Sequence, residues 1–189
     1  MKLTIGIDIG TKNLSLCAVG YESITSWMLL YYELVDTKIK SKENPISIIN
    51  IINRTLDTFH ENIDKIFMEK YKRKNPGYVV VVENQPGLKC IMERVMMAVI
   101  SYYMTKGKTI TAMNSNDKWK VFGGSVKVPR GKSNYAQRKS LSIEIGKKCI
   151  EDSRNTMKHL VNIDRIKKDD LFDSLIMALR INNHKFTIQ

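Results

Sequence analysis

Runs of apolar residues predict five β-strands in this chain. Residues 79–82 are four consecutive valines, and an apolar run without alternation is typical of a central strand buried on both faces. Shorter apolar or β-branched runs bounded by turn residues predict four more strands. The five predicted strands are residues 3–9, 14–20, 24–35, 78–83 and 108–113. The first three leave no room for a helix between them, so we expect them to pair antiparallel.

Apolar residues spaced three and four apart predict the helices. Pro45 opens the longest, which Asn75, Pro76 and Gly77 terminate. The helix predicted at 89–105 is apolar on more than one face, so we expect one side to cover the sheet and the other to require a partner, such as a second subunit. Two further helices are predicted at 134–151 and 169–182. The order predicts an α/β fold in a single domain, residues 1–189, with a mixed five-stranded sheet flanked by helices.

The charge balance points to a polyanionic partner. The chain has 31 Lys+Arg against 19 Asp+Glu, a formal net charge of +12, which favours nucleic acid over a membrane surface. The alternative is a soluble protein that is merely basic. Residues 115–148 contain many basic residues and only two acids, Asp117 and Glu144, as expected of a binding surface. These basic residues are Lys118, Lys120, Lys127, Arg130, Lys132, Arg138, Lys139, Lys147 and Lys148.

Several classes of protein are disfavoured. No segment reaches the roughly 18 apolar residues of a membrane span, and the N-terminus lacks the layout of a signal peptide. We therefore expect a soluble intracellular protein. Three cysteines without a CxxC motif indicate neither a disulfide framework nor a zinc site, so Cys17, Cys90 and Cys149 are expected to be reduced thiols. The histidines form no ligand pattern, and we expect surface or packing roles for His60, His159 and His184.

Acidic residues in apolar surroundings are the candidate chemistry. Asp8 lies within a predicted strand, Glu83 ends another, and Asp170 and Asp173 share a helix face. Burying an unpaired carboxylate costs several kcal/mol, and a divalent cation is one compensation. The alternatives are a turn cap at Asp8 and ordinary N-terminal helix chemistry in the last helix, which explains Asp169 well. Hard oxygen ligands suit Mg²⁺ or Mn²⁺, and two such ions can promote phosphoryl displacement.

Four segments in order resemble a known family. They are GIDIGTKNLS at 6–15, VVVENQP at 81–87, YAQRKSLSI at 135–143 and DDLFDSLIMAL at 169–179. Together they resemble the RuvC-type Holliday junction resolvases of the RNase H-like fold, most closely those of poxviruses. The resemblance implies a homodimer that cuts four-way DNA junctions symmetrically, with the helix at 89–105 at the dimer interface. It also implies a viral role in genome concatemer resolution, in the host cytoplasm.

The resemblance also implies roles for individual residues. Asp8, Glu83, Asp170 and Asp173 would be the catalytic acids that bind Mg²⁺, with Mn²⁺ able to substitute. Lys139 is the best match to a basic catalytic residue of the family, and Lys118 and Lys132 are competitors. Asp169 with Asp173 is a rival register for the last acidic pair. The residues expected to bind DNA are Lys12, Lys118, Lys120, Lys127, Arg130, Lys132 and Arg138.

Three other functions compete with this interpretation. GIDIGT also resembles the phosphate-binding hairpin of actin-like ATPases, but those proteins need a second such domain and a second glycine-rich loop, for which this chain is too short. A related nuclease acting on RNA–DNA hybrids would use a similar set of acids. A non-catalytic nucleic-acid-binding protein would gain from losing these acids, because carboxylates repel phosphates unless metal intervenes.

Overall fold

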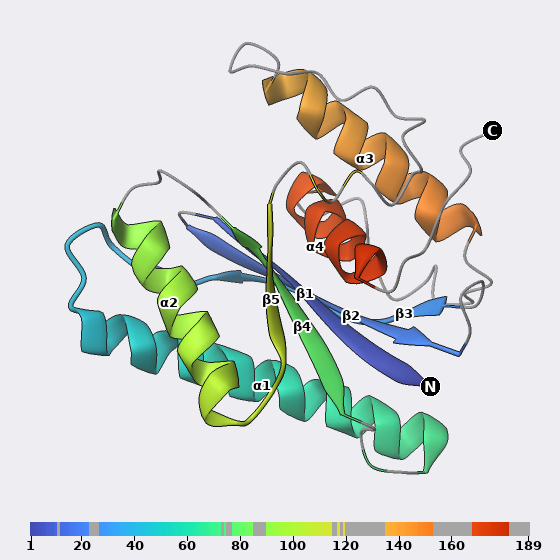
Figure 1. The fold of residues 1–189 in the computed structure, drawn as a ribbon, viewed down its shortest axis with the longest axis horizontal. Coiled ribbons are helices and arrows are strands. Elements are labelled where there is room, and N and C mark those ends of the chain that lie inside the picture. Colours follow the sequence, from blue (N-terminus) through green and yellow to red (C-terminus); the bar gives the residue numbers. More distant parts are fainter. Residues whose placement is uncertain are drawn as a thin grey trace.

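The predicted sheet is present, with strand order β3-β2-β1-β4-β5 (Figure 1). β1 pairs antiparallel with β2 and β2 with β3, whereas β4 is parallel to both β1 and β5. The valine run therefore lies in β4, between two neighbours, as expected of a strand buried on both faces. The computed structural model describes residues 1–10, 12–22, 27–72, 74, 77–84, 90–114, 117, 119, 135–152 and 168–181.

The predicted element order is confirmed, with boundaries that shift by one to three residues. The strands are β1 (Lys2–Ile9), β2 (Asn13–Tyr21), β3 (Trp27–Asp36), β4 (Tyr78–Asn84) and β5 (Ile110–Asn114). The helices are α1 (Pro45–Tyr71), α2 (Cys90–Thr105), α3 (Tyr135–Asp152) and α4 (Lys168–Arg180). The start predicted for the third strand, residues 24–26, lies outside the described residues.

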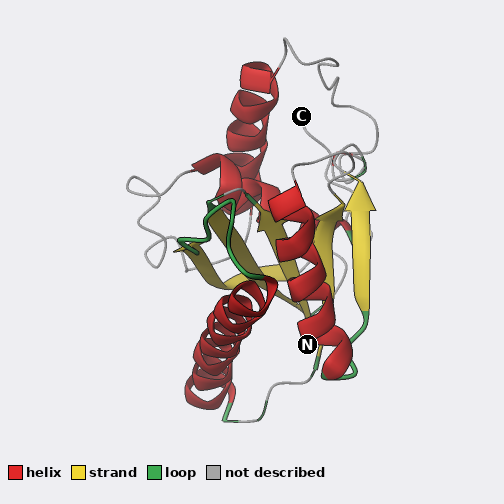
Figure 2. Ribbon diagram, turned by 90° about the vertical axis from the view of Figure 1, so that its left-hand side faces the viewer, coloured by secondary structure: helices red, strands yellow, loops and turns green. Residues whose placement is uncertain are grey.

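Helices cover both faces of the sheet (Figures 1 and 2). A large cluster of buried apolar residues lies on each face, and a smaller cluster of Val81, Met113 and Met177 joins β4, β5 and α4. Ile5 and Ile7 of β1 point toward α1 and α2 and are fully buried there. The alternate positions of the sheet face α4, against which α3 packs. Because side chains alternate along a strand, the same β1 supplies apolar residues to the first core and Thr4, Gly6 and Asp8 to the α4 face.

The helix α1 begins where its sequence predicts and ends at Tyr71, before the predicted terminators Asn75, Pro76 and Gly77. Asn44 caps the N-terminus by accepting a hydrogen bond from the backbone N–H of Ile46 at 2.8 Å, and Pro45 occupies the first turn. At the other end Lys72 adopts a left-handed conformation (φ 52°), and its N–H donates to the carbonyl of Met68 at 3.2 Å. None of the helices in the described part of the chain is long and apolar enough to span a membrane.

The helix α2 is buried on the side that covers the sheet, as expected, and exposed on the other side. Val99 and Tyr103 are fully buried against α1 and the sheet. On the outer side Met97 is 56% exposed and Met104 is 64% exposed. The two methionines are seven residues apart, so they lie on one face of the helix. Glu93, Arg94 and Ser101 are exposed on the same face, so it is mixed in character, and it is the side that the sequence predicts to need a partner.

The two cysteines whose side chains are described are buried thiols, as predicted. Cys17 lies in β2 and Cys149 in α3, both in the core of the α4 face. Burial raises the pKa of the Cys17 thiol, so it stays protonated at neutral pH. The side chain of Cys90 lies outside the described residues.

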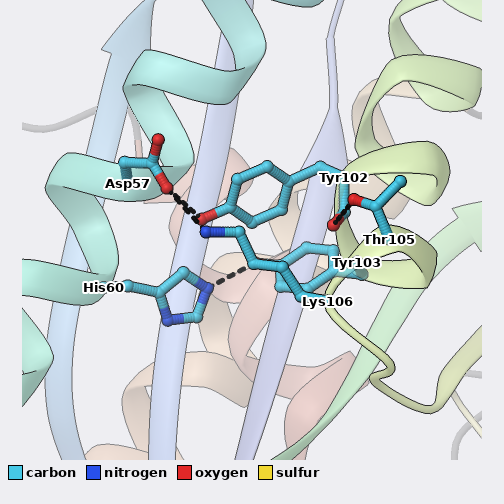
Figure 3. Close-up of polar contacts among 6 residues, drawn as sticks. All are labelled: Asp57, His60, Tyr102, Tyr103, Thr105 and Lys106. Atoms are coloured by element: carbon cyan, nitrogen blue, oxygen red, sulfur yellow. Dashed lines mark hydrogen bonds and ion pairs between the residues drawn. The ribbon is translucent and has the colours of Figure 1, made fainter.

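His60 has the packing role expected of it, in a polar cluster that joins α1 to α2 (Figure 3). Its ring stacks on Tyr78 at 4.6 Å between centroids, and its Nε2 hydrogen-bonds the Tyr103 hydroxyl at 3.1 Å. Beside it, the Tyr102 hydroxyl and Lys106 Nζ donate to Asp57 Oδ1 at 2.7 and 2.9 Å. The cluster fixes the C-terminal end of α2 on α1.

We expect His60 to make the fold sensitive to acid. Burial lowers the pKa of His60 from 6.5 to about 4; Asp64 and Asp57 oppose the shift, while Lys106 and Lys108 add to it. Because the unfolded chain takes up this proton first, the stabilisation is complete above pH 6.5 and is lost as pH falls toward 4. The difference corresponds to up to about 3 kcal/mol.

The measurement is urea unfolding of the parent and of His60→Gln at several pH values between 4 and 7. The free energy of unfolding should fall more steeply with decreasing pH in the parent than in His60→Gln. Parallel curves for the two proteins over this range would contradict the assignment. Comparing the two proteins removes the contribution of the carboxylates that titrate in the same range.

Candidate active site

The ends of two neighbouring strands place Asp8 and Glu83 at the same edge of the sheet. β1 and β4 are parallel, with Ile7 opposite Val82, so Asp8 and Glu83 each follow directly after this pair. Both belong to the face that α4 covers, since Val82 points into the opposite core and Glu83 is one position further on. Glu83 is buried, at 8% exposure, and Asp8 is half-buried. The parallel register therefore brings these two carboxylates to one edge of the sheet.

The helix α4 lies across this face and carries the other two acids, Asp170 and Asp173 (Figure 1). Its close approach depends on Gly6 of β1, where a Cβ atom would overlap the carbonyl oxygen of Ser174. From β2, the Ser15 hydroxyl donates to the backbone carbonyl of Asp170 at 2.9 Å and lies 2.9 Å from the Ser174 hydroxyl. Ser15 is the register partner of Asp8, so these bonds set the start of α4 above the end of β1.

The pKa of the Tyr32 hydroxyl, on β3, is affected by two of the acids. Burial is the main cause that raises the pKa of Tyr32, and the Ser15 hydroxyl opposes it. The negative charges of Asp170 and Asp8 raise the pKa of Tyr32 further. Asp8 from the sheet and Asp170 from α4 therefore both lie near one hydroxyl, although 162 positions separate them in the sequence.

The helix α3 contacts the fourth acid. The Ser142 hydroxyl, 1% exposed, donates a short hydrogen bond to Oδ1 of Asp173. One turn later α3 lies so close to α4 that a Cβ atom at Gly146 would overlap the side chain of Phe172. Arg138 and Lys139 occupy the preceding turn of α3 and are half-buried. The basic segment and the acidic helix therefore pack directly on each other.

The structure describes the four predicted acids and two of the predicted DNA-binding residues. Asp8, Glu83, Asp170 and Asp173 belong to the α4 face or to α4 itself, and Lys12 is exposed in the turn that follows β1. Asp169 is in the first turn of α4, but its side chain lies outside the described residues, so the rival register is untested. Five of the expected DNA-binding residues also lie outside the described residues: Lys118, Lys120, Lys127, Arg130 and Lys132.

The donor set has the chemistry that Mg²⁺ or Mn²⁺ requires, four carboxylates on adjoining elements with one of them buried. As the side chains are placed, however, no three His, Cys, Asp or Glu residues in the described ranges form a group that could hold a metal ion. Metal binding would thus need these side chains to rotate, or further ligands from residues outside the described ranges. Metal binding by these four residues stays a prediction.

Four residues around the acids were missed by sequence reasoning. Ser15, Ser142 and Ser174 are buried serines, and Tyr32 lies beside Ser15. The signal for Ser15 and Ser174 was present in the sequence: each is a polar residue within an apolar run, LSLCAV in β2 and LFDSLIMAL in α4. Ser142 lies between Leu141 and Ile143, whereas the exposed Ser140 follows Lys139, but this difference does not indicate that Ser142 contacts Asp173.

No protein-family model matches the chain, and no curated protein matches it in sequence. Solved structures do match it. RuvC of Thermus thermophilus in complex with a Holliday junction substrate is 19% identical, with a TM-score of 0.59 over 95% of this chain and 92% of that one. A second structure of T. thermophilus RuvC is 19% identical, with a TM-score of 0.57 over 96% and 94% of the two chains. Ydc2, the yeast mitochondrial Holliday junction resolvase, is 14% identical, with a TM-score of 0.59 over 96% of this chain and 79% of that chain. This chain therefore has the RNase H-like fold of the RuvC-type Holliday junction resolvases.

Proposed function

We propose that this chain is a structure-selective DNA endonuclease that resolves four-way junctions by metal-dependent phosphodiester hydrolysis. One observation carries the proposal. Asp8 and Glu83 lie at the ends of neighbouring parallel strands, on the face of the sheet that the acidic helix α4 covers. The same fold occurs in RuvC bound to a Holliday junction and in Ydc2. In this proposal residues 1–189 act as one RNase H-like unit.

The acids would hold the metal, and the basic residues would hold the DNA. Bound Mg²⁺, or Mn²⁺ in its place, would stabilise negative charge on the phosphate and make a water nucleophilic. Asp8, Glu83, Asp170 and Asp173 are the proposed ligands, two from the sheet and two from α4. Lys139, in the α3 turn next to Ser142, is the proposed basic residue near the scissile phosphate.

Two described cations, Lys12 and Arg138, and the basic composition of the chain support DNA binding. Lys12 is exposed in the turn after Asp8, and Arg138 lies in the first turns of α3. The residues of 115–134 add to the net charge of +12. Cationic side chains gain affinity for DNA by releasing counterions from the phosphates. We propose that Lys12 and Arg138 contact the junction arms on either side of the acids.

We further propose a homodimer formed through the outer face of α2. Met97 and Met104 expose more than half of their surface there, and large exposed apolar side chains in register on one helix favour a protein contact. A two-fold dimer would present two equal sites to a four-way junction, whose symmetry it shares. The viral setting, and with it the host cytoplasm, rests on the sequence resemblance alone.

Charged residues on this face are expected to dissociate the dimer. Met97→Glu combined with Met104→Glu would bury two carboxylates without partners, so the double variant should be monomeric at concentrations where the parent is dimeric. Sedimentation equilibrium measures the mass directly. Met68→Glu, at a methionine of α1 that is 53% exposed, is the matched control and should leave the mass unchanged. A parent that sediments as a monomer would refute the dimer.

The test of the proposed function is cleavage of three labelled substrates: a four-way junction, a linear duplex and an RNA–DNA hybrid. Each is incubated with Mg²⁺, with Mn²⁺ and with chelator. We expect paired, symmetric nicks in the junction alone, and only with metal. Cleavage of the hybrid would favour a ribonuclease H instead, and binding without cleavage under any metal would reduce the proposal to a junction-binding protein.

A further inference from the structure

We propose that the segment between β3 and α1 is a further DNA contact, which binds the phosphate backbone of a junction arm. Its exposed cations are Lys38, Lys40 and Lys42, and we call residues 37–44 the lysine segment. The inference rests on the proposed function and deepens it, because it names where the protein holds its substrate beside the acids. Ammonium groups bind phosphates whatever the base sequence, so the lysine segment would add affinity without selecting a cutting sequence.

The sheet topology places the lysine segment at the same edge as the acids. β2 is antiparallel to both β1 and β3, so β3 runs in the direction of β1. Asp36 at the carboxyl end of β3 lies opposite Asn13, and Asp8 near the carboxyl end of β1 lies opposite Ser15, two positions along the same strand β2. Neighbouring strands are about 4.8 Å apart, so β3 lies about 10 Å to one side of β1. In Figure 1 the segment is the light-blue loop at the left, which leads from β3 into α1.

Hydrogen bonds fix the lysine segment to the turn between β1 and β2. The backbone N–H and the hydroxyl of Thr37 both donate to the carbonyl of Lys12, each at 3.1 Å. Thr37 and Ile39 are buried, each 9% exposed, whereas Lys38 and Lys40 are exposed. The buried residues anchor the chain, and the alternate lysines face solvent. Lys12, which is also exposed, therefore belongs to the same surface.

The lysines of this segment are available to a polyanion. Within the described part of the chain, no ion pair engages the ammonium group of any of the three. Of the two acids nearby, Asp36 accepts the backbone N–H of Lys38 on Oδ1 at 3.0 Å, and Glu43 is half-buried. Together with Lys12 the surface has four cations against these two acids. It is therefore positive, at the edge of the sheet where a phosphodiester must approach the acids.

The chain offers an equal set of lysines at the opposite edge of the sheet. Lys70, Lys72 and Lys74 lie at and after the C-terminal end of α1 and are exposed. α1 begins directly after the lysine segment and has 27 residues, which makes it about 40 Å long. It ends before the amino end of β4, the strand that carries Glu83 near its carboxyl end. Removing these three charges changes the net charge of the protein equally and leaves the surface beside the acids intact.

The test compares two triple variants: Lys38→Gln with Lys40→Gln and Lys42→Gln, and Lys70→Gln with Lys72→Gln and Lys74→Gln. Junction affinity is measured by fluorescence anisotropy in Ca²⁺ over a range of KCl concentrations. For the first variant we expect the slope of log affinity against log salt to become shallower by about 0.9 for each lost phosphate contact, thus by up to about 2.7, and the affinity at low salt to fall at least about tenfold. The second variant should keep the parent's slope, because salt screens charges beyond about 10 Å. Single-turnover cleavage at saturating protein should be unchanged in both, since the lysine segment contacts the DNA away from the reacting phosphate.

The outcomes separate this inference from the proposed function. If the parent binds and cuts the junction and the first variant has the parent's salt slope, the lysine segment is not a DNA contact and the proposed function stands. An equal loss of affinity in both variants would assign the effect to net charge and would also overturn the inference. If the parent neither binds nor cuts the junction, the proposed function fails and the inference falls with it. Should the first variant not fold, Lys40→Gln alone takes its place, with an expected change in slope of about 0.9.

Discussion

Replacing Asp173 with asparagine is expected to lower junction cleavage by at least about 10³-fold while leaving the fold and junction binding in place. The carboxylate is a proposed metal ligand, and the charge stabilisation that a metal supplies is worth several kcal/mol, of which each 1.4 kcal/mol is tenfold in rate. Asparagine keeps the shape of the side chain and an oxygen that can accept the Ser142 hydrogen bond. The change therefore removes the charge with little effect on the packing of α3 against α4.

Three measurements make the Asp173→Asn result specific. Single-turnover cleavage of the junction gives the rate, a gel shift in Ca²⁺ gives the affinity, and thermal unfolding gives the stability. Glu144→Gln is the control: Glu144 is an exposed acid of α3 that pairs with Lys148 at 3.1 Å, and its loss should change none of the three. Cleavage by Asp173→Asn within tenfold of the parent would remove Asp173 from the proposed ligands.

The sheet and the placement of two acids could be predicted from the sequence because short-range signals determine them. Four consecutive valines mark β4 as a central strand. Two parallel strands with Asp8 and Glu83 at corresponding carboxyl ends must bring these residues to one edge of the sheet. Period-two alternation then assigns both acids to the α4 face, opposite Ile7 and Val82.

Contacts between helices were beyond the sequence pattern. Ser142 lies between Leu141 and Ile143 and Ser140 follows Lys139, but the contact of Ser142 with Asp173 appears only when α3 packs on α4. That packing depends on Gly146. From the sequence alone, a glycine in a helix interior indicates only a mild loss of helix stability. The structure shows the reason for it, because a Cβ atom there would overlap the side chain of Phe172. The exposed outer face of α2 likewise depends on which side of the helix the sheet covers.

Replacing Gly6 with alanine is expected to destabilise the fold and to reduce cleavage together. A Cβ atom at Gly6 would overlap the Ser174 carbonyl oxygen and lie 3.0 Å from the backbone nitrogen of Ala178. These are backbone atoms of a helix, so no side-chain rotation can relieve the clash and α4 must move off the sheet. Overpacking of this kind costs about 1–3 kcal/mol, and for a chain of this length the Tm should fall by about 2–12 °C.

Gly20→Ala is the matched control for this clash, because it is the same substitution in the neighbouring strand β2. A Cβ atom there would meet Met1 Sδ at 2.8 Å and Leu30 Cδ1 at 3.0 Å, both ends of flexible side chains that can move aside. We expect a smaller loss of stability and unchanged cleavage at a temperature where the protein is folded. Equal Tm values for the two variants would contradict the close approach of β1 to α4.

The cleavage rate of the folded Gly6→Ala variant tests whether the position of α4 matters for the active site as well as for stability. Asp170 and Asp173 belong to α4 and move with it. The Ser15 hydroxyl can donate to the Asp170 carbonyl, 2.9 Å away, only while the helix stays close to the sheet. A shift of α4 by even an ångström would separate these two acids from Asp8 and Glu83. Cleavage measured well below the Tm should therefore fall by more than the unfolded fraction explains, whereas a merely structural role for Gly6 would leave the folded fraction fully active. The absence of a side chain at Gly6 would then be a requirement of the site as well as of the fold.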